Sequence, residues 1–327
     1  WLYADLAAQA AGSVAVGVYP TSPPKQVEYI LGHSDAVLIV AKDQEQTDKI
    51  LEVRTRLPKL RKMIVIDMKG LRHYGDPDIL FFEELEALGK QKAGNHPALF
   101  EELLLQTNPA DVCLMVYTSG TTGPPKGAML THTNLVSLAK SFSQVTALTR
   151  EDQVVSYLPL SHIAERLVSL ILALQVGYTV NFAESIDTVQ ESLYDIAPTV
   201  FVGVPRIWEK MHAAIQIRMK DASLLKKLAY GFWVPLGRKM ADREIQGRPN
   251  HLGWSLLRWL GYLCLYRSIL DKLGLLKVKV AFSGSAPIAP EILKFYRSIG
   301  LKISEVYGQT EGSGVSHIHH GHEAKVG

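Results

Sequence analysis

Cysteine is scarce in this sequence, and its scarcity excludes two kinds of site. The 327 residues include two cysteines, Cys113 and Cys264, which lie far apart and form no CxxC pair. A disulfide framework and a cysteine-ligated zinc site are therefore both excluded. Such cysteine usage is typical of a reducing compartment, and we expect a cytoplasmic protein.

Long apolar runs and a strong excess of charge are also missing. No stretch reaches the roughly 20 uncharged residues that a membrane-spanning helix needs. The formal net charge is +3, with 47% hydrophobic and 20% charged residues. This small charge argues against a nucleic-acid-binding protein, and the composition is that of a folded globular chain.

Neither end of the sequence has the features of a natural terminus. The chain starts at Trp1 with no basic and apolar leader, and it stops at Gly327 without completing a helix or strand. We therefore expect a fragment that lacks both ends of a longer protein.

Short β-branched runs alternate with segments of helical period. Segments 186–196 and 290–299 have the helical period, and the second begins with Pro290 at a favourable first-turn position. This alternation predicts an α/β fold, with parallel sheets covered by helices on both faces. The predicted strands are 36–40, 63–67, 112–117, 179–182, 199–204, 277–282 and 303–306.

The predicted elements divide into two subdomains. Residues 1–105 form a first α/β subdomain that is incomplete at its start, and the polar, helix-prone stretch 89–102 is a plausible linker. Residues 106–327 form a second subdomain with a basic helical insert at about 211–275. We expect this second subdomain to bind the substrates, because nearly all the motifs lie in it.

The most informative segment is the loop 117–132, which follows a predicted strand. Glycines allow backbone N–H groups to turn toward an anion, hydroxyls add further donors, and a lysine adds a point charge suited to polyphosphate. The segment therefore predicts a site for the β- and γ-phosphates of a nucleotide. The predicted phosphate-binding residues are Thr118, Ser119, Gly120, Thr121, Thr122, Gly123 and Lys126.

This loop differs from a Walker loop. The Walker motif has Gly before its lysine and Ser or Thr after it, whereas Lys126 stands between Pro125 and Gly127. The alternative is a surface linker rich in Ser, Thr and Gly. A strand before the loop and a helix after it, with Thr131 or Thr133 as the cap, favour the phosphate site.

The segment from Tyr117 to His132 resembles the signature loop of the adenylate-forming superfamily. This superfamily includes acyl-CoA synthetases, luciferases and peptide-synthetase adenylation domains. The resemblance implies two doubly wound, mostly parallel sheets packed together, the large N-terminal domain of such an enzyme. It also implies that the C-terminal lid domain is absent from this chain.

The segment Tyr157-Leu-Pro-Leu-Ser-His-Ile-Ala-Glu-Arg166 resembles the second conserved block of that superfamily. In relatives its histidine, here His162, lies between the acyl pocket and the α-phosphate and changes rotamer between steps. Taken alone, a histidine at a helix start is more often a cap or a core residue. For Glu165 and Arg166 a local ion pair is the simplest interpretation.

Two later turns follow the order of the superfamily motifs. The turn Ser283-Gly-Ser-Ala-Pro287 resembles the adenine shelf, although many strand-to-helix turns are equally rich in small residues. In Tyr307-Gly-Gln-Thr-Glu311 the tyrosine can stack on adenine, and the acid suits Mg²⁺. The resemblance assigns adenine to Gly284, Ser285, Ala286, Tyr307 and Gly308.

The resemblance implies a two-step reaction. A carboxylate oxygen attacks the α-phosphorus of ATP and pyrophosphate leaves; the thiol of coenzyme A then attacks the acyl carbon and AMP leaves. Catalysis rests on positioning and charge neutralisation, with Mg²⁺ held by Glu311, Thr118 and the ATP phosphates. The implied catalytic residues are Thr310, Glu311, Lys126 and His162.

The segments around the motifs indicate which carboxylic acid is the substrate. Val204-Pro-Arg-Ile-Trp-Glu-Lys210, the insert after it and Val16-Gly-Val-Tyr-Pro-Thr-Ser22 resemble long-chain, bubblegum-type synthetases. We expect a long-chain fatty acid–CoA ligase. Medium-chain and aryl acids, a peptide-synthetase-type domain serving a carrier protein, and a nucleotide-binding module without turnover remain alternatives.

The insert itself is strongly basic. Residues 206–279 contain fifteen Lys or Arg and five Asp or Glu, and an aromatic and apolar run lies at 252–266. This combination fits peripheral contact with lipid on the inner face of a membrane. A solvated helical pair packed through its Trp and Leu residues is the equally weighted alternative.

A histidine-rich segment, His317-Ile-His-His-Gly-His322, lies near the end of the chain. Its four histidines could ligate zinc, but they lack the spacing of a structural site and have no cysteine partners. A loop at the surface or at the rim of a pocket is the favoured interpretation.

Overall fold

The computed structural model describes residues 1–118, 123–248 and 252–318. The chain divides into two compact units, Trp1–Leu135 with Pro159–Ile163, and Val136–Leu158 with Ala164–Gly327. The predicted boundary near residue 105 is wrong, because β1 (Ala15–Val16) pairs in parallel with β5 (Val112–Thr118). This pairing places β5 in the first unit.

The first unit contains two three-stranded sheets, in the orders β1-β5-β6 and β2-β3-β4. Its core lies where β2 and β3 meet α2 and α3, around side chains such as Val27, Ile50, Met63 and Val65. The elements not yet given are α1 (Leu2–Ala10), α2 (Pro24–His33), β2 (Leu38–Ala41), α3 (Gln44–Val53), η1 (Arg54–Arg56), β3 (Lys62–Val65), β4 (Ile79–Phe81), α4 (Phe82–Asn95), α5 (Leu99–Gln106) and β6 (Lys126–Thr131).

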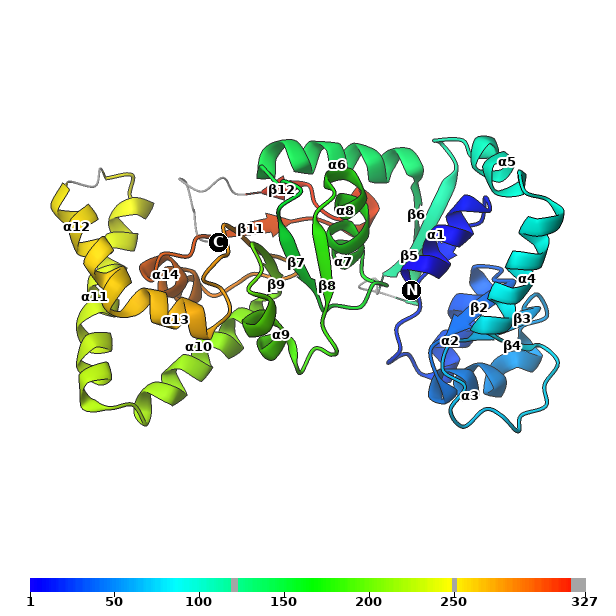
Figure 1. Cartoon of the computed structure of the whole chain (residues 1–327), viewed down its shortest axis with the longest axis horizontal. Helices are drawn as coiled ribbons and strands as arrows, with labels where there is room; N and C mark the ends of the chain where they lie inside the picture. The colour runs from blue at the N-terminus through cyan, green and yellow to red at the C-terminus, as the bar shows by residue number, and fades with distance from the viewer. Residues whose placement is uncertain (119–122, 249–251, 319–327) are drawn as a thin grey trace. The chain divides into compact units, whose positions relative to one another are not determined.

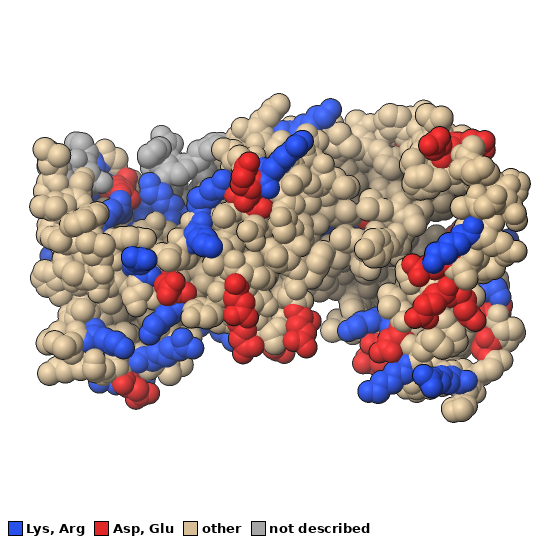
Figure 2. Space-filling view, in the orientation of Figure 1, with Lys and Arg blue, Asp and Glu red and all other residues tan. Residues whose placement is uncertain are grey.

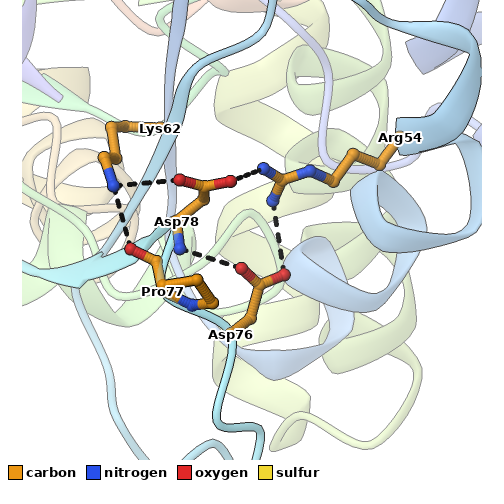
Figure 3. A network of polar contacts seen from close by, with 5 residues as sticks. All are labelled: Arg54, Lys62, Asp76, Pro77 and Asp78. Carbon is orange, nitrogen blue, oxygen red and sulfur yellow. Dashed lines mark hydrogen bonds and ion pairs between the residues drawn. The ribbon is translucent and has the colours of Figure 1, made fainter.

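An ion network joins η1 to β3 and to the turn before β4 (Figure 3). Lys62 Nζ lies 2.9 Å from a carboxylate oxygen of Asp78, and Arg54 bonds both Asp76 and Asp78. The lysine and the arginine together lower the pKa of the Asp78 carboxyl. The network ties the last strand of this sheet to its neighbour β3.

The second unit is built on one six-stranded sheet in the order β12-β11-β10-β9-β7-β8. All neighbours in it are parallel except β11 and β12. The α/β class is confirmed, with three sheets among the described residues where two were expected. The strands are β7 (Gln153–Ser156), β8 (Thr179–Phe182), β9 (Val200–Gly203), β10 (Val280–Ser283), β11 (Ile303–Tyr307) and β12 (His317–Ile318).

Successive residues of the central strands enter opposite cores. Val154, Val200 and Phe282 pack with Phe142 and Leu167, and their neighbours Val155, Phe201 and Ala281 join a second cluster on the other face. Side chains alternate across a strand, so apolar residues at consecutive positions bury both faces. The helices of this unit outside the insert are α6 (His132–Thr146), α7 (Ile163–Arg166), η2 (Leu167–Ile171), α8 (Leu172–Val176), α9 (Val189–Ile196), α14 (Pro290–Ser298) and η4 (Thr310–Gly312).

The basic insert is helical, as predicted. It leaves β9 through α10 (Pro205–Lys220), turns back through α11 (Leu224–Ile245), and returns to β10 after α12 and α13 (Figure 1). The returning part comprises α12 (Leu252–Gly261), the π-helix η3 (Tyr262–Tyr266) and α13 (Arg267–Lys272). Within the described ranges, no helix combines the length and the apolarity needed to cross a bilayer.

Trp208 of α10 connects the insert to the sheet. Its side chain is fully buried. The indole Nε1–H donates to the carbonyl oxygens of Gly203 and Phe282, at 3.1 and 3.3 Å. A Cβ on Gly203 would lie 2.5 Å from that nitrogen, so glycine is needed for the close approach. One side chain thereby joins the ends of β9 and β10.

We expect Trp208→Phe to destabilise the protein by about 2–3 kcal/mol, because two carbonyls lose their donor and part of the buried ring is lost. Urea unfolding would measure this change. The control is Trp259→Phe, whose side chain is 56% exposed, and which should change stability by less than about 0.5 kcal/mol. Equal effects of the two substitutions would contradict the assignment.

Candidate functional site

The loop before Lys126 is the turn of an antiparallel hairpin. β5 pairs with β6, and Thr118 lies opposite Lys126 in the last pair before the loop. The expected strand before this segment and helix after it are both present, with α6 beginning at His132, but the strand β6 within the segment was not predicted. Thr131 does cap that helix, since the N–H of Asn134 donates to its hydroxyl at 3.2 Å. The hairpin holds two predicted phosphate ligands side by side.

The described part of the loop fits an anion site. Gly123 has φ +86°, a left-handed conformation that favours glycine. Lys126 is exposed, and no ion pair involving it occurs among the described residues. Its ammonium therefore faces solvent, where an anion can reach it. Four predicted ligands lie outside the described residues: Ser119, Gly120, Thr121 and Thr122.

Both flanks of the loop are held by side chains of α2. The Tyr29 hydroxyl donates to the carbonyl oxygen of Pro125 at 3.0 Å, and a 2.7 Å hydrogen bond joins His33 Nδ1 and the Tyr117 hydroxyl. The rings of Tyr29 and His33 stack with centroids 5.4 Å apart, and both meet Tyr117 edge-on. We call Tyr29, His33 and Tyr117 the aromatic brace.

Two members of the brace, Tyr29 and His33, were not among the residues predicted from the sequence. The signal was available in the i, i+4 spacing of Tyr29 and His33, which places both on one face of the helix after Pro24. Their target could not be inferred, because the loop is 84 residues further along the chain from His33.

His162 stands immediately before α7, in the segment that belongs to the first unit. Its backbone N–H donates to the carbonyl of Pro159 at 2.9 Å. Burial lowers the pKa of the imidazole, so the ring is neutral at pH 7. A Cβ on Gly17 would lie 2.9 Å from Ser161 Cα, so a side chain there would displace this segment. Gly17 thus helps to place His162.

The expected ion pair between Glu165 and Arg166 is wrong, because no such pair occurs in the part of the chain that the structure describes. The Glu165 carboxylate is buried, and the hydroxyls of Ser156 and Ser169 donate to the same oxygen at 2.6 and 2.5 Å. Burial raises the pKa of this carboxyl, and the two hydroxyls offset only part of the rise. A carboxyl held in this way has a structural role.

The remaining predicted residues gather at the carboxyl ends of two neighbouring strands of the second unit. β10 ends at Ser283 and β11 ends at Tyr307, and the two strands run in parallel. Ligands of parallel sheets bind at this kind of edge. The shelf turn 284–286 and the segment 307–311 follow these ends directly.

Two glycines at this edge have no room for a side chain. A Cβ on Gly284 would lie 2.6 Å from a methyl carbon of Val306, and one on Gly308 would lie 1.8 Å from the Gly314 carbonyl oxygen. The two turns therefore approach neighbouring backbone closely, as the adenine assignment requires. Ser285 has φ +70° and is exposed together with Ala286, which leaves the turn accessible to a flat ring.

The polar residues that follow β11 are open to solvent. Tyr307 is 66% exposed, and its ring lies 6.0 Å from that of His317. Thr310 and Glu311 begin the short helix η4, with the threonine half-buried and the acid exposed. Glu311 forms no ion pair within the described ranges, so its carboxylate is available to a cation.

The described residues provide no metal site built from protein side chains alone. The described residues contain no cluster of three His, Cys, Asp or Glu side chains. His317 belongs to β12, whereas His319, His320 and His322 lie outside the described residues. The zinc alternative for this segment therefore stays untested.

The hydroxyl of Tyr29 provides a direct test of the brace. We expect Tyr29→Phe to weaken pyrophosphate binding about two- to tenfold, because one hydrogen bond to the loop is lost while the ring stack is kept. Isothermal titration calorimetry would measure the affinity. Tyr194→Phe, at a side chain that is 59% exposed, is the control. An unchanged affinity in Tyr29→Phe would show that the brace does not position the loop.

The raised pKa of Glu165 predicts a pH-dependent stability. A folded-state pKa above the unfolded value of about 4.3 means that folding favours the protonated acid, so stability falls as pH rises through the folded pKa. Glu165→Gln should therefore gain stability relative to the parent between about pH 5 and about pH 8. Urea unfolding at both pH values would measure the gain. A difference that does not change with pH would contradict this explanation, and Glu191→Gln serves as the exposed control.

The family model described as AMP-binding enzyme matches residues 1–327. Among curated proteins, the long-chain-fatty-acid–CoA ligase ACSBG2 of Xenopus laevis is 31% identical over 324 residues, covering 96% of this chain and 42% of that protein. ACSBG1 of Bos taurus is 32% identical over 325 residues, with 96% and 43% covered. The chain thus spans less than half the length of these relatives.

Solved structures share the fold. A benzoate CoA ligase from Burkholderia xenovorans LB400 superposes with a TM-score of 0.61 at 20% identity, covering 99% of this chain and 51% of that one. The A-PCP didomain of the carboxylic acid reductase from Segniliparus rugosus, in complex with AMP, gives 0.61 at 22% identity, with 96% and 41% covered. Because the family model covers the whole sequence and the fold agrees, this chain belongs to the AMP-binding enzyme family.

Proposed function

We propose that the protein to which this chain belongs activates a long-chain fatty acid to acyl-AMP and then to acyl-CoA, with ATP and coenzyme A as co-substrates. The observation that carries the proposal is the identity of about 30% to long-chain-fatty-acid–CoA ligases across 96% of this chain. The predicted motifs fall at a hairpin loop in one unit and at strand ends in the other, positions that suit their proposed roles.

Each group of residues is assigned the part of ATP that its chemistry fits. Thr118 and Lys126 bind the β- and γ-phosphates, since one donates a hydrogen bond and the other neutralises charge. Tyr307 stacks on adenine beside the small-residue turn 284–286. Thr310 donates to the α-phosphate, the group that the carboxylate of the acid attacks.

Mg²⁺ is the cofactor that this assignment implies. The exposed carboxylate of Glu311 fits it, because hard oxygen ligands suit this ion. The described residues offer no cluster of protein ligands around it, so Thr118 and the phosphates would complete the set. When bound, the ion neutralises charge that develops on the phosphates during transfer.

His162 is assigned a positioning role beside the reacting groups. Its imidazole is neutral at pH 7, because burial lowers its pKa. A neutral ring can approach the acid substrate without forming an ion pair that would hold the carboxylate back from the α-phosphorus. The chemistry of the first step then depends on placing the carboxylate oxygen in line with the leaving pyrophosphate.

An amino-acid-activating domain is the main alternative enzyme. It needs an ionised carboxylate in its pocket to pair with the α-amino group of the substrate, and we consider Glu165 of the second conserved block as the candidate. Glu165 is 5% exposed and is already bonded to Ser156 and Ser169. This arrangement supports the fatty-acid assignment over the amino-acid one.

The proposal includes a place in the cell. We propose a cytoplasmic protein that contacts membrane lipid through its basic insert, since long-chain fatty acids partition into bilayers.

Calorimetry with a non-hydrolysable palmitoyl-AMP mimic tests the proposed substrates. We expect the mimic to bind more tightly than Mg-ATP, and each CH₂ removed from a buried tail to lower its affinity by up to about fourfold, the equivalent of about 0.8 kcal/mol. Glu311→Gln should weaken Mg-ATP but not metal-free ATP. Lys126→Ala should weaken both.

Two substitutions at exposed residues serve as controls for these affinity changes. Glu191→Gln and Lys92→Ala change exposed residues of α9 and α4 and should leave both affinities unchanged. Binding of ATP without any contribution from the acyl tail would retain the nucleotide site and reject the fatty acid. Tight binding without acyl-AMP formation would identify this chain as a binding module that needs the rest of its parent protein for turnover.

A further inference from the structure

An apolar face on α12 and η3 is turned toward solvent. Leu252, Leu256, Trp259 and Leu263 are exposed by 91, 58, 56 and 51%. Their spacing of four, three and four residues places them on one side of the helix. Folded domains normally turn such a face inward, so a continuous exposed face of this kind marks an interaction site.

The opposite side of α12 is fixed to α11. Arg258 pairs with Glu244, and the Arg243 guanidinium lies 5.4 Å from the ring centre of Trp254. These charged contacts lie on the inner side of the helix, which reverses the usual arrangement of an amphipathic helix. The apolar side is therefore held outward by specific contacts.

The first half of α11 adds a second exposed apolar stripe. Leu225, Leu228 and Phe232 are exposed by 79, 61 and 61%. Their spacing of three and four residues again places them on one helical face. Lys226 and Lys227 are exposed in the same turn, so cationic groups stand among the apolar ones.

The charge around these stripes is predominantly positive, although Asp221 and Asp271 are exposed near their ends. The sequence contains no Asp or Glu from residue 245 to residue 270, whereas Arg248 and Arg267 are exposed on either side of the α12 face. In Figure 2, the part of the surface over α11 and α12 is largely uncharged, and the charged side chains around it are mostly Lys and Arg, with Asp or Glu among them. This pattern complements a partner that is apolar within and anionic at its surface.

We propose that the exposed faces of α11 and α12 dock on the surface of an anionic lipid bilayer. The leucines would enter the boundary of the acyl chains, and Trp259 would lie at the level of the headgroups, where indole rings concentrate. Lys226, Lys227 and Arg267 would contact the anionic headgroups. The helices would lie along the membrane surface and would not cross it.

A second copy of the chain fits this surface less well. A symmetric contact places the same patch on both partners. Such a contact would bring the excess of Lys and Arg on this surface of one copy against the same excess on the other. An anionic bilayer satisfies both the apolar and the cationic groups.

Vesicle flotation tests the proposal without ATP or a fatty acid, so it can fail while the ligase proposal stands. We expect the chain to float with vesicles of phosphatidylcholine containing about 30% phosphatidylglycerol, and to bind phosphatidylcholine alone at least tenfold more weakly. Salt at about 0.5 M should reduce the binding to the mixed vesicles.

Two pairs of substitutions localise the contact. Leu256→Asp should lower vesicle affinity at least tenfold, whereas Leu105→Asp, at an 86% exposed leucine of α5, should leave it unchanged. With brominated lipids, quenching of tryptophan fluorescence should be lost in Trp259→Phe and retained in Trp254→Phe. Unfolding midpoints would confirm that all four variants are folded.

Three results would overturn the proposal. The first is equal binding to neutral and anionic vesicles, and the second is no binding to either. The third is a dimer, seen by sedimentation equilibrium, that Leu256→Asp abolishes and vesicles do not compete with. That result would identify a second copy as the partner of this surface.

Discussion

Burial of both faces of the six-stranded sheet is the constraint that places the proposed ligand-binding residues of the second unit. Consecutive residues of β7, β9 and β10 enter separate apolar cores, so neither face of these strands can carry a binding group. Polar and small residues are then confined to the strand ends. The shelf turn and the segment after Tyr307 lie at such ends because β10 and β11 are parallel neighbours.

In the first unit, the predicted phosphate ligands that the structure describes lie at the end of an antiparallel hairpin. Its loop is the turn of a hairpin whose last pair is Thr118 with Lys126, and the aromatic brace holds the residues on both sides of the turn. A glycine-rich loop has little conformational preference of its own. α2 contacts the described residues on either side of it, Tyr117 and Pro125, through His33 and Tyr29.

The sequence predicted the class of fold and the places of most motifs, because both depend on local patterns. Buried strands such as Val112–Thr118 are continuous apolar runs, and small-residue turns mark their ends. The strand β6 was not predicted, because Lys126 and Gly127 at its start have the polar, flexible character of a loop. The division of the units was also not predicted correctly, since the pairing of β1 with β5 joins residues about a hundred positions apart.

The ion pair expected between Glu165 and Arg166 failed for a related reason. Two adjacent charged residues in a helix point in different directions, and burial favours whichever partner lies within reach. For Glu165 the partners are the hydroxyls of Ser156 and Ser169, one on a strand and one on the next helical turn. No pattern within the motif shows that a strand nine residues earlier supplies one of them.

Charged and apolar side chains are exposed in opposite ways among the proposed nucleotide ligands and in the basic insert. Among the residues proposed to act on the nucleotide, Lys126 and Glu311 are exposed, whereas His162 is half-buried and its pKa is lowered by burial. In the insert, the ion pair of Arg258 with Glu244 faces inward and the leucines of α12 face solvent. The sequence left packed helices and a lipid surface equally weighted for this insert. The direction of that ion pair favours the lipid surface, because a helix packed through its leucines would have turned Arg258 outward.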